Sequence, residues 1–231
     1  MINCLICGQS FIPRVSYLKI LSLIKKSEKS ICAHCMKKFE DLGEIRCRFC
    51  SKKLPKADIC DDCKNWQKIY QKDILINHSI YKYNDFFHDL MVNYKRYGDY
   101  VLYRVLEQLC MEELSGLNFD YYVPIPTSKD HQERRQFDTI SSIYQNIVPL
   151  SYALEKMDIS GSQGEKNRIE RLATPQSFLV EKDNEKFQYK DESSFLLLDD
   201  IYTTGRTLYH ARDALRSVFP KAKIESFSIC R

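Results

Sequence analysis

The sequence lacks any apolar run that approaches the roughly 20 residues needed to span a bilayer. It also begins, at Met1-Ile2-Asn3-Cys4, without the basic stretch and following apolar stretch of a secretory signal. Both absences favour a protein that stays in the cytoplasm. Apolar residues make up 44% of the chain and charged residues 29%, a composition that excludes a disordered protein and predicts a packed core.

Cysteine is almost missing after residue 63, where only Cys110 and Cys230 occur. The other eight cysteines form four C-x-x-C pairs. This spacing is typical of metal knuckles, in which each tight turn offers two thiolates and two turns complete the tetrahedral site of a structural Zn²⁺. We therefore predict two zinc ions, whose ligands are Cys4, Cys7, Cys32, Cys35, Cys47, Cys50, Cys60 and Cys63.

The spacing does not fix which knuckles share an ion. Sequential pairing joins the first two knuckles and the last two, and crossed pairing remains open. Redox pairs and free structural thiols are alternatives that four repeats make less favoured, and His34 is an alternative ligand inside the second knuckle. A closed four-sulfur site leaves no position for a substrate, so the predicted ions are structural.

The length of 231 residues accommodates one α/β domain and a small extra module. Up to about residue 66 the chain is turn-rich and has little to bury, so metal must supply its folding free energy. Beyond it, strand patterns alternate with helix patterns, which predicts a parallel sheet of the α/β class. We place the boundary near residue 70, with a double zinc-ribbon module over 1–70 and a second domain over 71–231.

The expected strands cover 74–76, 79–83, 120–126, 195–198 and 224–229. One helix is expected to begin after Asn84 and end by Asp99, and the others cover 101–109, 135–147 and 207–218. Residues 158–177 show neither the helical nor the strand spacing of apolar residues and are expected to form a long functional loop.

The segment 195–207 carries the strongest chemical signal. An apolar strand ends at the acidic pair Asp199 and Asp200, and the carboxyl ends of parallel strands are where ligands bind. The next turn opens a helix, so its free backbone N–H groups and threonine hydroxyls can hold a phosphate. The predicted phosphate-binding residues are Thr203, Thr204, Gly205, Arg206 and Thr207. A metal site or a solvated turn is the alternative use of the acidic pair.

This segment resembles the phosphoribosyl pyrophosphate (PRPP) signature of type I phosphoribosyltransferases, with the same apolar strand, acidic pair and Thr-Thr-Gly-x-Thr turn. The resemblance implies a type I phosphoribosyltransferase-like fold. It also implies that Asp199 and Asp200 bind the ribose hydroxyls as catalytic residues, while residues 203–207 hold the 5′-phosphate of PRPP, which binds with Mg²⁺.

A wider resemblance covers the whole chain and rests on the four knuckles, Tyr81-Lys82-Tyr83, the stretch Tyr94–Asp99, Val123-Pro124-Ile125-Pro126 and the signature turn. With these motifs the chain is similar to the ComF/ComFC family of late competence proteins. The resemblance implies a role in natural transformation, with action on incoming single-stranded DNA in the cytosol and a helicase-like partner, ComFA.

The chain departs from the usual Arg-Gly-Phe-Asn-Gln stretch of that family, because it has Arg134-Arg135-Gln136-Phe137-Asp138 instead. This loop would face the diphosphate, so the departure bears on turnover more than on ribose-phosphate binding. The predicted diphosphate contacts are Arg135 and, in the long loop, Arg168 and Arg171. A solvated basic loop is the alternative for these arginines.

The N-terminal third is the basic part of the chain, with 15 Lys and Arg against 7 Asp and Glu over residues 1–72. Eight thiolates on two Zn²⁺ ions would halve that excess to about four charges. A non-catalytic DNA-binding module and a scaffold for ComFA therefore remain rivals of a transferase. The candidate DNA contacts are Lys25, Lys26, Lys37, Lys38, Arg46, Arg48, Lys52 and Lys53 for charge and Tyr17, Phe39, Phe49 and Trp66 for base stacking. The alternative for half or more of these aromatics is a place in a small core.

Overall fold

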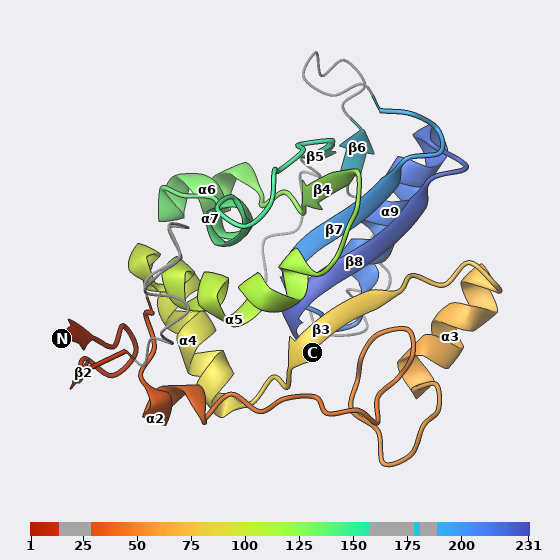
Figure 1. Ribbon diagram of the computed structural model, residues 1–231. Coiled ribbons are helices and arrows are strands. Elements are labelled where there is room, and N and C mark those ends of the chain that lie inside the picture. Colours follow the sequence, from red (N-terminus) through yellow and green to blue (C-terminus); the bar gives the residue numbers. More distant parts are fainter. Residues whose placement is uncertain (14–28, 158–177, 181–188) are drawn as a thin grey trace.

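The computed structural model describes residues 1–13, 29–157, 178–180 and 189–231 (Figure 1). Its centre is a sheet of four parallel strands in the order β3-β8-β7-β4. The strands are β3 (Asn77–Tyr81), β8 (Lys223–Cys230), β7 (Ser194–Ile201) and β4 (Tyr121–Pro124). The predicted α/β class with a parallel sheet is therefore confirmed.

Helices cover both faces of the sheet. The helices α4 (Asp85–Lys95), α5 (Tyr103–Ser115) and α7 (Thr139–Tyr144) share one core, and α9 (Arg206–Val218) contributes to the other. Figure 1 shows α5 in front of the sheet and α9 behind it. A short 3-10 helix, η1 (Tyr100–Leu102), leads into α5.

The strand β7 explains why its sequence is a continuous apolar run. Leu196 and Leu198 belong to the core of α4, α5 and α7, while Phe195 and Leu197 belong to the core of α9. Successive side chains of a strand point to opposite faces, so a strand that is covered on both faces is apolar at every position. All four side chains are fully buried.

The N-terminal part consists of short elements. They are the antiparallel pair β1 (Ile2–Asn3) and β2 (Ser10–Phe11), then α2 (Ala33–Met36) and α3 (Asp61–Tyr70). In Figure 1 this red-to-orange chain runs from α2 beneath α4 to α3 on the opposite side of the molecule. It therefore reaches both cores of the sheet. The proposed boundary near residue 70 stays a prediction.

Two secondary-structure predictions were wrong. Residues 74–76 form no strand, although Ile74 and Leu75 are buried, and β3 begins at Asn77. The helix expected over 135–147 is shorter than predicted, because α6 (Lys129–Arg135) ends where that helix was expected to begin and α7 begins only at Thr139. Gln136 takes a left-handed φ of 63°, and the Asp138 carboxylate then accepts from the Ser141 N–H at 2.6 Å and caps a new helix.

The remaining elements are the antiparallel pair β5 (Leu154–Lys156) and β6 (Phe178–Val180). The loop expected over 158–177 lies outside the described residues. Within the described ranges, the helices are all too short or too polar to cross a membrane.

Candidate functional site

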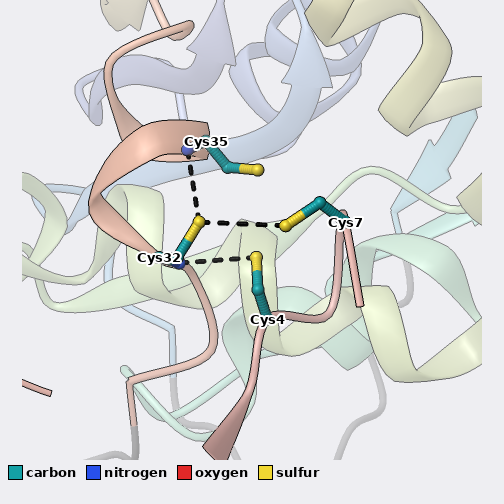
Figure 2. A group of neighbouring side chains, drawn as sticks. All are labelled: Cys4, Cys7, Cys32 and Cys35. Atoms are coloured by element: carbon teal, nitrogen blue, oxygen red, sulfur yellow. Dashed lines mark hydrogen bonds between the residues drawn. The ribbon is translucent and has the colours of Figure 1, made fainter. Parts of the chain in front are cut away.

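The first cysteine cluster consists of Cys4, Cys7, Cys32 and Cys35, which come from the β1–β2 turn and the start of α2. The four sulfur atoms lie within 4.8 Å of one another and face a common centre (Figure 2). Cys7 Sγ is 3.9 Å from Cys32 Sγ, and the Cys32 N–H donates to Cys4 Sγ at 3.4 Å. Of these four residues only Cys7 is exposed.

The second cluster consists of Cys47, Cys50, Cys60 and Cys63, and all four are buried. Cys50 Sγ lies 3.5 Å from Cys60 Sγ, and the Cys60 N–H donates to Cys47 Sγ at 3.4 Å. Cys60 is the N-cap residue of α3, just as Cys32 is that of α2. Each cluster therefore joins one loop knuckle to one helix start.

Both clusters fit a structural zinc ion. Four sulfurs at about 2.3 Å from a tetrahedral ion lie about 3.8 Å apart, close to the measured separations. The pairing of knuckles is sequential, which decides the question that spacing left open. His34 is exposed and is not a member of either cluster. The zinc ions would close their sites completely, so their chemistry is structural.

The acidic pair lies at the carboxyl edge of the sheet, as expected, but within β7 rather than after it. Consecutive strand residues point to opposite faces, so the two carboxylates differ in environment. Asp200 is 3% exposed, and its Oδ2 forms an ion pair with Lys95 Nζ at the end of α4. Asp199 keeps some exposure, and its carbonyl oxygen accepts from Tyr144 Oη at 2.7 Å.

Electrostatics separate the two acids further. Burial raises the pKa of Asp199 to about 7, and the neighbouring charge of Asp200 adds to this rise, while Lys95 opposes it. A carboxyl group with this pKa changes its charge near neutral pH.

Lys95 is a site residue that sequence reasoning missed. It stands in the last turn of α4, where a lysine is ordinary because it opposes the helix dipole. Its carbonyl oxygen accepts from Arg135 Nε at 2.9 Å. Burial, followed by the charge of Arg134, lowers the pKa of Arg135. One predicted diphosphate residue, Arg135, thus lies beside Lys95, whereas Arg168 and Arg171 lie outside the described residues.

The 203–207 turn leaves the sheet immediately after β7. Gly205 has a φ of 80°, and a Cβ there would overlap the Tyr202 hydroxyl, so both backbone and space require glycine. The Arg206 N–H donates to Thr204 Oγ1 at 3.3 Å, and the side chains of Thr203 and Thr207 are exposed. In the part of the chain that the structure describes, no acceptor is recorded for the N–H groups of residues 203–205.

The chain is 31% identical over 232 residues to the competence protein ComFC of Streptococcus pneumoniae (strain ATCC BAA-255 / R6), covering 99% of this chain and 100% of that protein. The chain belongs to the ComFC family of competence proteins. It is also 27% identical over 234 residues to the ComFC protein of Bacillus subtilis (strain 168), covering 99% and 94% respectively. No protein-family model matches the chain.

This member of the ComFC family does not present its predicted base-stacking residues as a surface. Trp66 is 3% exposed and Phe39 is 6% exposed, because Trp66 stacks on Tyr209 and Phe39 packs against Phe86 and Phe87. Phe49 is half-buried with the Arg48 guanidinium over its ring. Tyr17, Lys25 and Lys26 lie outside the described residues. Phe39 and Trp66 are therefore core residues, the alternative to base stacking, and the stacking role does not hold for them.

Proposed function

We propose that this ComFC-family protein acts in natural competence as a binding protein for PRPP or a related ribose phosphate. The observation that carries the proposal is the 203–207 turn, whose N–H groups stand at the carboxyl edge of a parallel sheet beside two acids. A phosphate accepts hydrogen bonds from such amides and is favoured by the positive end of α9. The exposed hydroxyls of Thr203 and Thr207 supply further donors.

The neighbouring side chains fit the rest of the ligand. The partly exposed carboxylate of Asp199 can accept from a ribose hydroxyl, and Asp200 next to it is already charge-balanced by Lys95. Lys95 and Arg135 place positive charge at the same edge, where a diphosphate with its Mg²⁺ would lie. The acids and cations together match a ribose that carries phosphate at both ends.

Transferase activity is a further step that the same groups allow. In that reaction an acceptor nucleophile forms a bond to C1 of the ribose as the bond to the diphosphate breaks, and the diphosphate leaves with the bonding electrons. Asp199 would stabilise the positive charge that develops on the sugar. Release of diphosphate in the presence of an acceptor panel tests this step, and no release across the panel argues for binding alone.

Calorimetry with PRPP and Mg²⁺ tests the binding proposal, with the wild type compared against Asp199→Asn. We expect affinity to fall roughly 10-fold to 100-fold, the usual cost of a lost charge-assisted hydrogen bond. Asp199→Asn is the cleaner variant, because Asp200→Asn leaves Lys95 without its buried partner. Equal affinity of wild type and Asp199→Asn would contradict the assigned role of the acid.

Exposed basic side chains support a second candidate function, the binding of single-stranded DNA by the cysteine-rich part, alone or with a ComFA helicase partner. The exposed members of the predicted set are Lys37, Lys38, Arg46, Arg48, Lys52 and Lys53. Binding through phosphates must weaken steeply as salt rises. Affinity that is equal at low and high salt would count against it. Deleting residues 1–66 is no clean test, since Cys4, Ile31 and Phe39 share a core with α4.

A further inference from the structure

Trp66 connects the cysteine-rich part to the 203–207 turn. It lies on α3, three residues after Cys63, and stacks on Tyr209 of α9 with ring centroids 4.1 Å apart. Its Nε1–H donates to the carbonyl oxygen of Thr204 at 2.9 Å, and the hydrogen bond is buried. A helix that begins at a ligand of the second cluster thus holds one carbonyl of the turn.

Arg231 makes a second connection. Its Nη1 donates to the carbonyl oxygen of Thr203 at 2.7 Å. Its Nη2 lies 3.5 Å from Cys50 Sγ and 3.2 Å from Asp62 Oδ2, so the same guanidinium touches a cysteine of the second cluster and the residue before Cys63. The guanidinium also lies over the Tyr202 ring at 4.7 Å.

The two connections fix where the amides of the turn point. The carbonyl of Thr203 shares a peptide plane with the N–H of Thr204, and the carbonyl of Thr204 shares one with the N–H of Gly205. In a trans peptide, which the described chain has throughout, C=O and N–H point in opposite directions. Holding both carbonyls toward the second cluster therefore turns both N–H groups away from it, toward the ligand side.

We propose that the metal-loaded second cluster positions the 203–207 turn, through Trp66 and Arg231, for phosphate binding. This inference rests on the proposed function. Loss of metal from the second cluster frees α3 and the Cys50 knuckle, the turn loses its fixed carbonyls, and phosphate affinity falls. Loss of metal from the first cluster has a smaller effect, because that cluster lies in the other core, adjoins the site only through α4, and makes no contact with the turn among the described residues.

The sequence offers a matched pair of variants for the metal. Cys60→Ser and Cys32→Ser each remove one ligand at a helix N-cap, a position that serine favours. We expect each variant to bind one zinc ion fewer by elemental analysis. PRPP affinity with Mg²⁺, measured by calorimetry, should fall at least tenfold in Cys60→Ser and distinctly less in Cys32→Ser.

Trp66→Phe tests the positioning without touching the metal, since phenylalanine keeps an aromatic ring on Tyr209 but removes the N–H donor together with part of the indole ring. We expect unchanged zinc content and PRPP affinity reduced roughly fivefold to tenfold, the effect of one hydrogen bond. Trp66 is also the single tryptophan of the chain, so its emission reports on the turn directly. PRPP should change that emission in the wild type.

The outcomes separate the two proposals. A zinc-loaded wild type that binds no PRPP overturns the proposed function and the inference together. A wild type that binds PRPP, with Trp66→Phe and Cys60→Ser binding it equally well, overturns the inference alone. If Cys60→Ser does not fold, the PRPP affinity of Trp66→Phe tests the inference instead. A loss of affinity in Cys32→Ser as large as that in Cys60→Ser also overturns the inference.

Discussion

The two cysteine clusters have the same ligand set and the same local geometry, but they lie in different cores. The first cluster packs with Phe39 against α4, on one face of the sheet. The second packs with Trp66 against α9 and the Tyr202 ring, on the other face. Two clusters with identical motifs therefore contact different parts of the protein, depending on the face of the sheet that each one covers. Only the second cluster adjoins the turn that we propose to bind phosphate.

The largest expected effect comes from removing metal. Structural zinc contributes about 10–16 kcal/mol of apparent binding free energy in small zinc-finger peptides, so both knuckle pairs should unfold when stripped. Graded chelation should remove the first ion before the second, because Cys7 is exposed while all four residues of the second cluster are buried. Zinc release and circular dichroism followed together should show two steps. A single step would mean that the chelator reaches both clusters equally well.

A matched pair of aromatic truncations comes next. Trp66→Ala and Phe39→Ala each empty a buried site beside one cluster, and each should lower the free energy of unfolding by about 3–5 kcal/mol. Denaturant unfolding measures this loss. Only Trp66→Ala should also weaken PRPP binding. Equal weakening by Phe39→Ala would remove the functional difference between the two cores.

Glycine substitutions should have a smaller effect. Gly205 and Gly43 both have positive φ, of 80° and 74°, but only at Gly205 would a Cβ collide with a neighbour, Tyr202. Gly43→Ala should cost about 1–2 kcal/mol for the left-handed backbone alone. Gly205→Ala should cost roughly twice that and abolish PRPP binding, as thermal unfolding and calorimetry can measure. Equal melting temperatures for the two variants would show that the turn is not tightly held.

The smallest expected effect concerns pH. The pKa of Asp199 is raised to about 7, first by burial and then by Asp200. The unfolded state ionises this group near pH 4, so between pH 4 and 7 the folded state holds the extra proton and stability falls as pH rises. The change should be about 1 kcal/mol, since Asp199 is only partly buried. The Asp199→Asn variant should not show this loss of stability when its unfolding free energy is measured from pH 4 to 8.

Sequence alone predicted what depends on local spacing. The continuous apolar run of β7 and the order of acids, turn and helix follow from period and composition, and the knuckles follow from the C-x-x-C spacing. Residues 135–147 were misread because the apolar period passed over Asp138, although aspartate is a strong N-cap signal.

The remaining features arise from tertiary contacts between segments far apart in the chain. Trp66 and Thr204 are 138 residues apart, and Lys95 meets Asp200 only when α4 packs on the sheet. No local pattern distinguishes these residues from ordinary core or helix-end residues. The pairing of the knuckles was likewise undecidable from their spacing.

The strand order has a consequence for synthesis. β8 lies between β3 and β7, so β3 has no neighbour in the sheet until residues 223–230 have left the ribosome. The eight cysteines of the two clusters, in contrast, have emerged once residue 63 has, and at 5–20 residues per second the rest of the chain takes roughly ten to thirty seconds. Nascent chains therefore have time to load both ions before the sheet closes, and zinc starvation should act on this protein during translation.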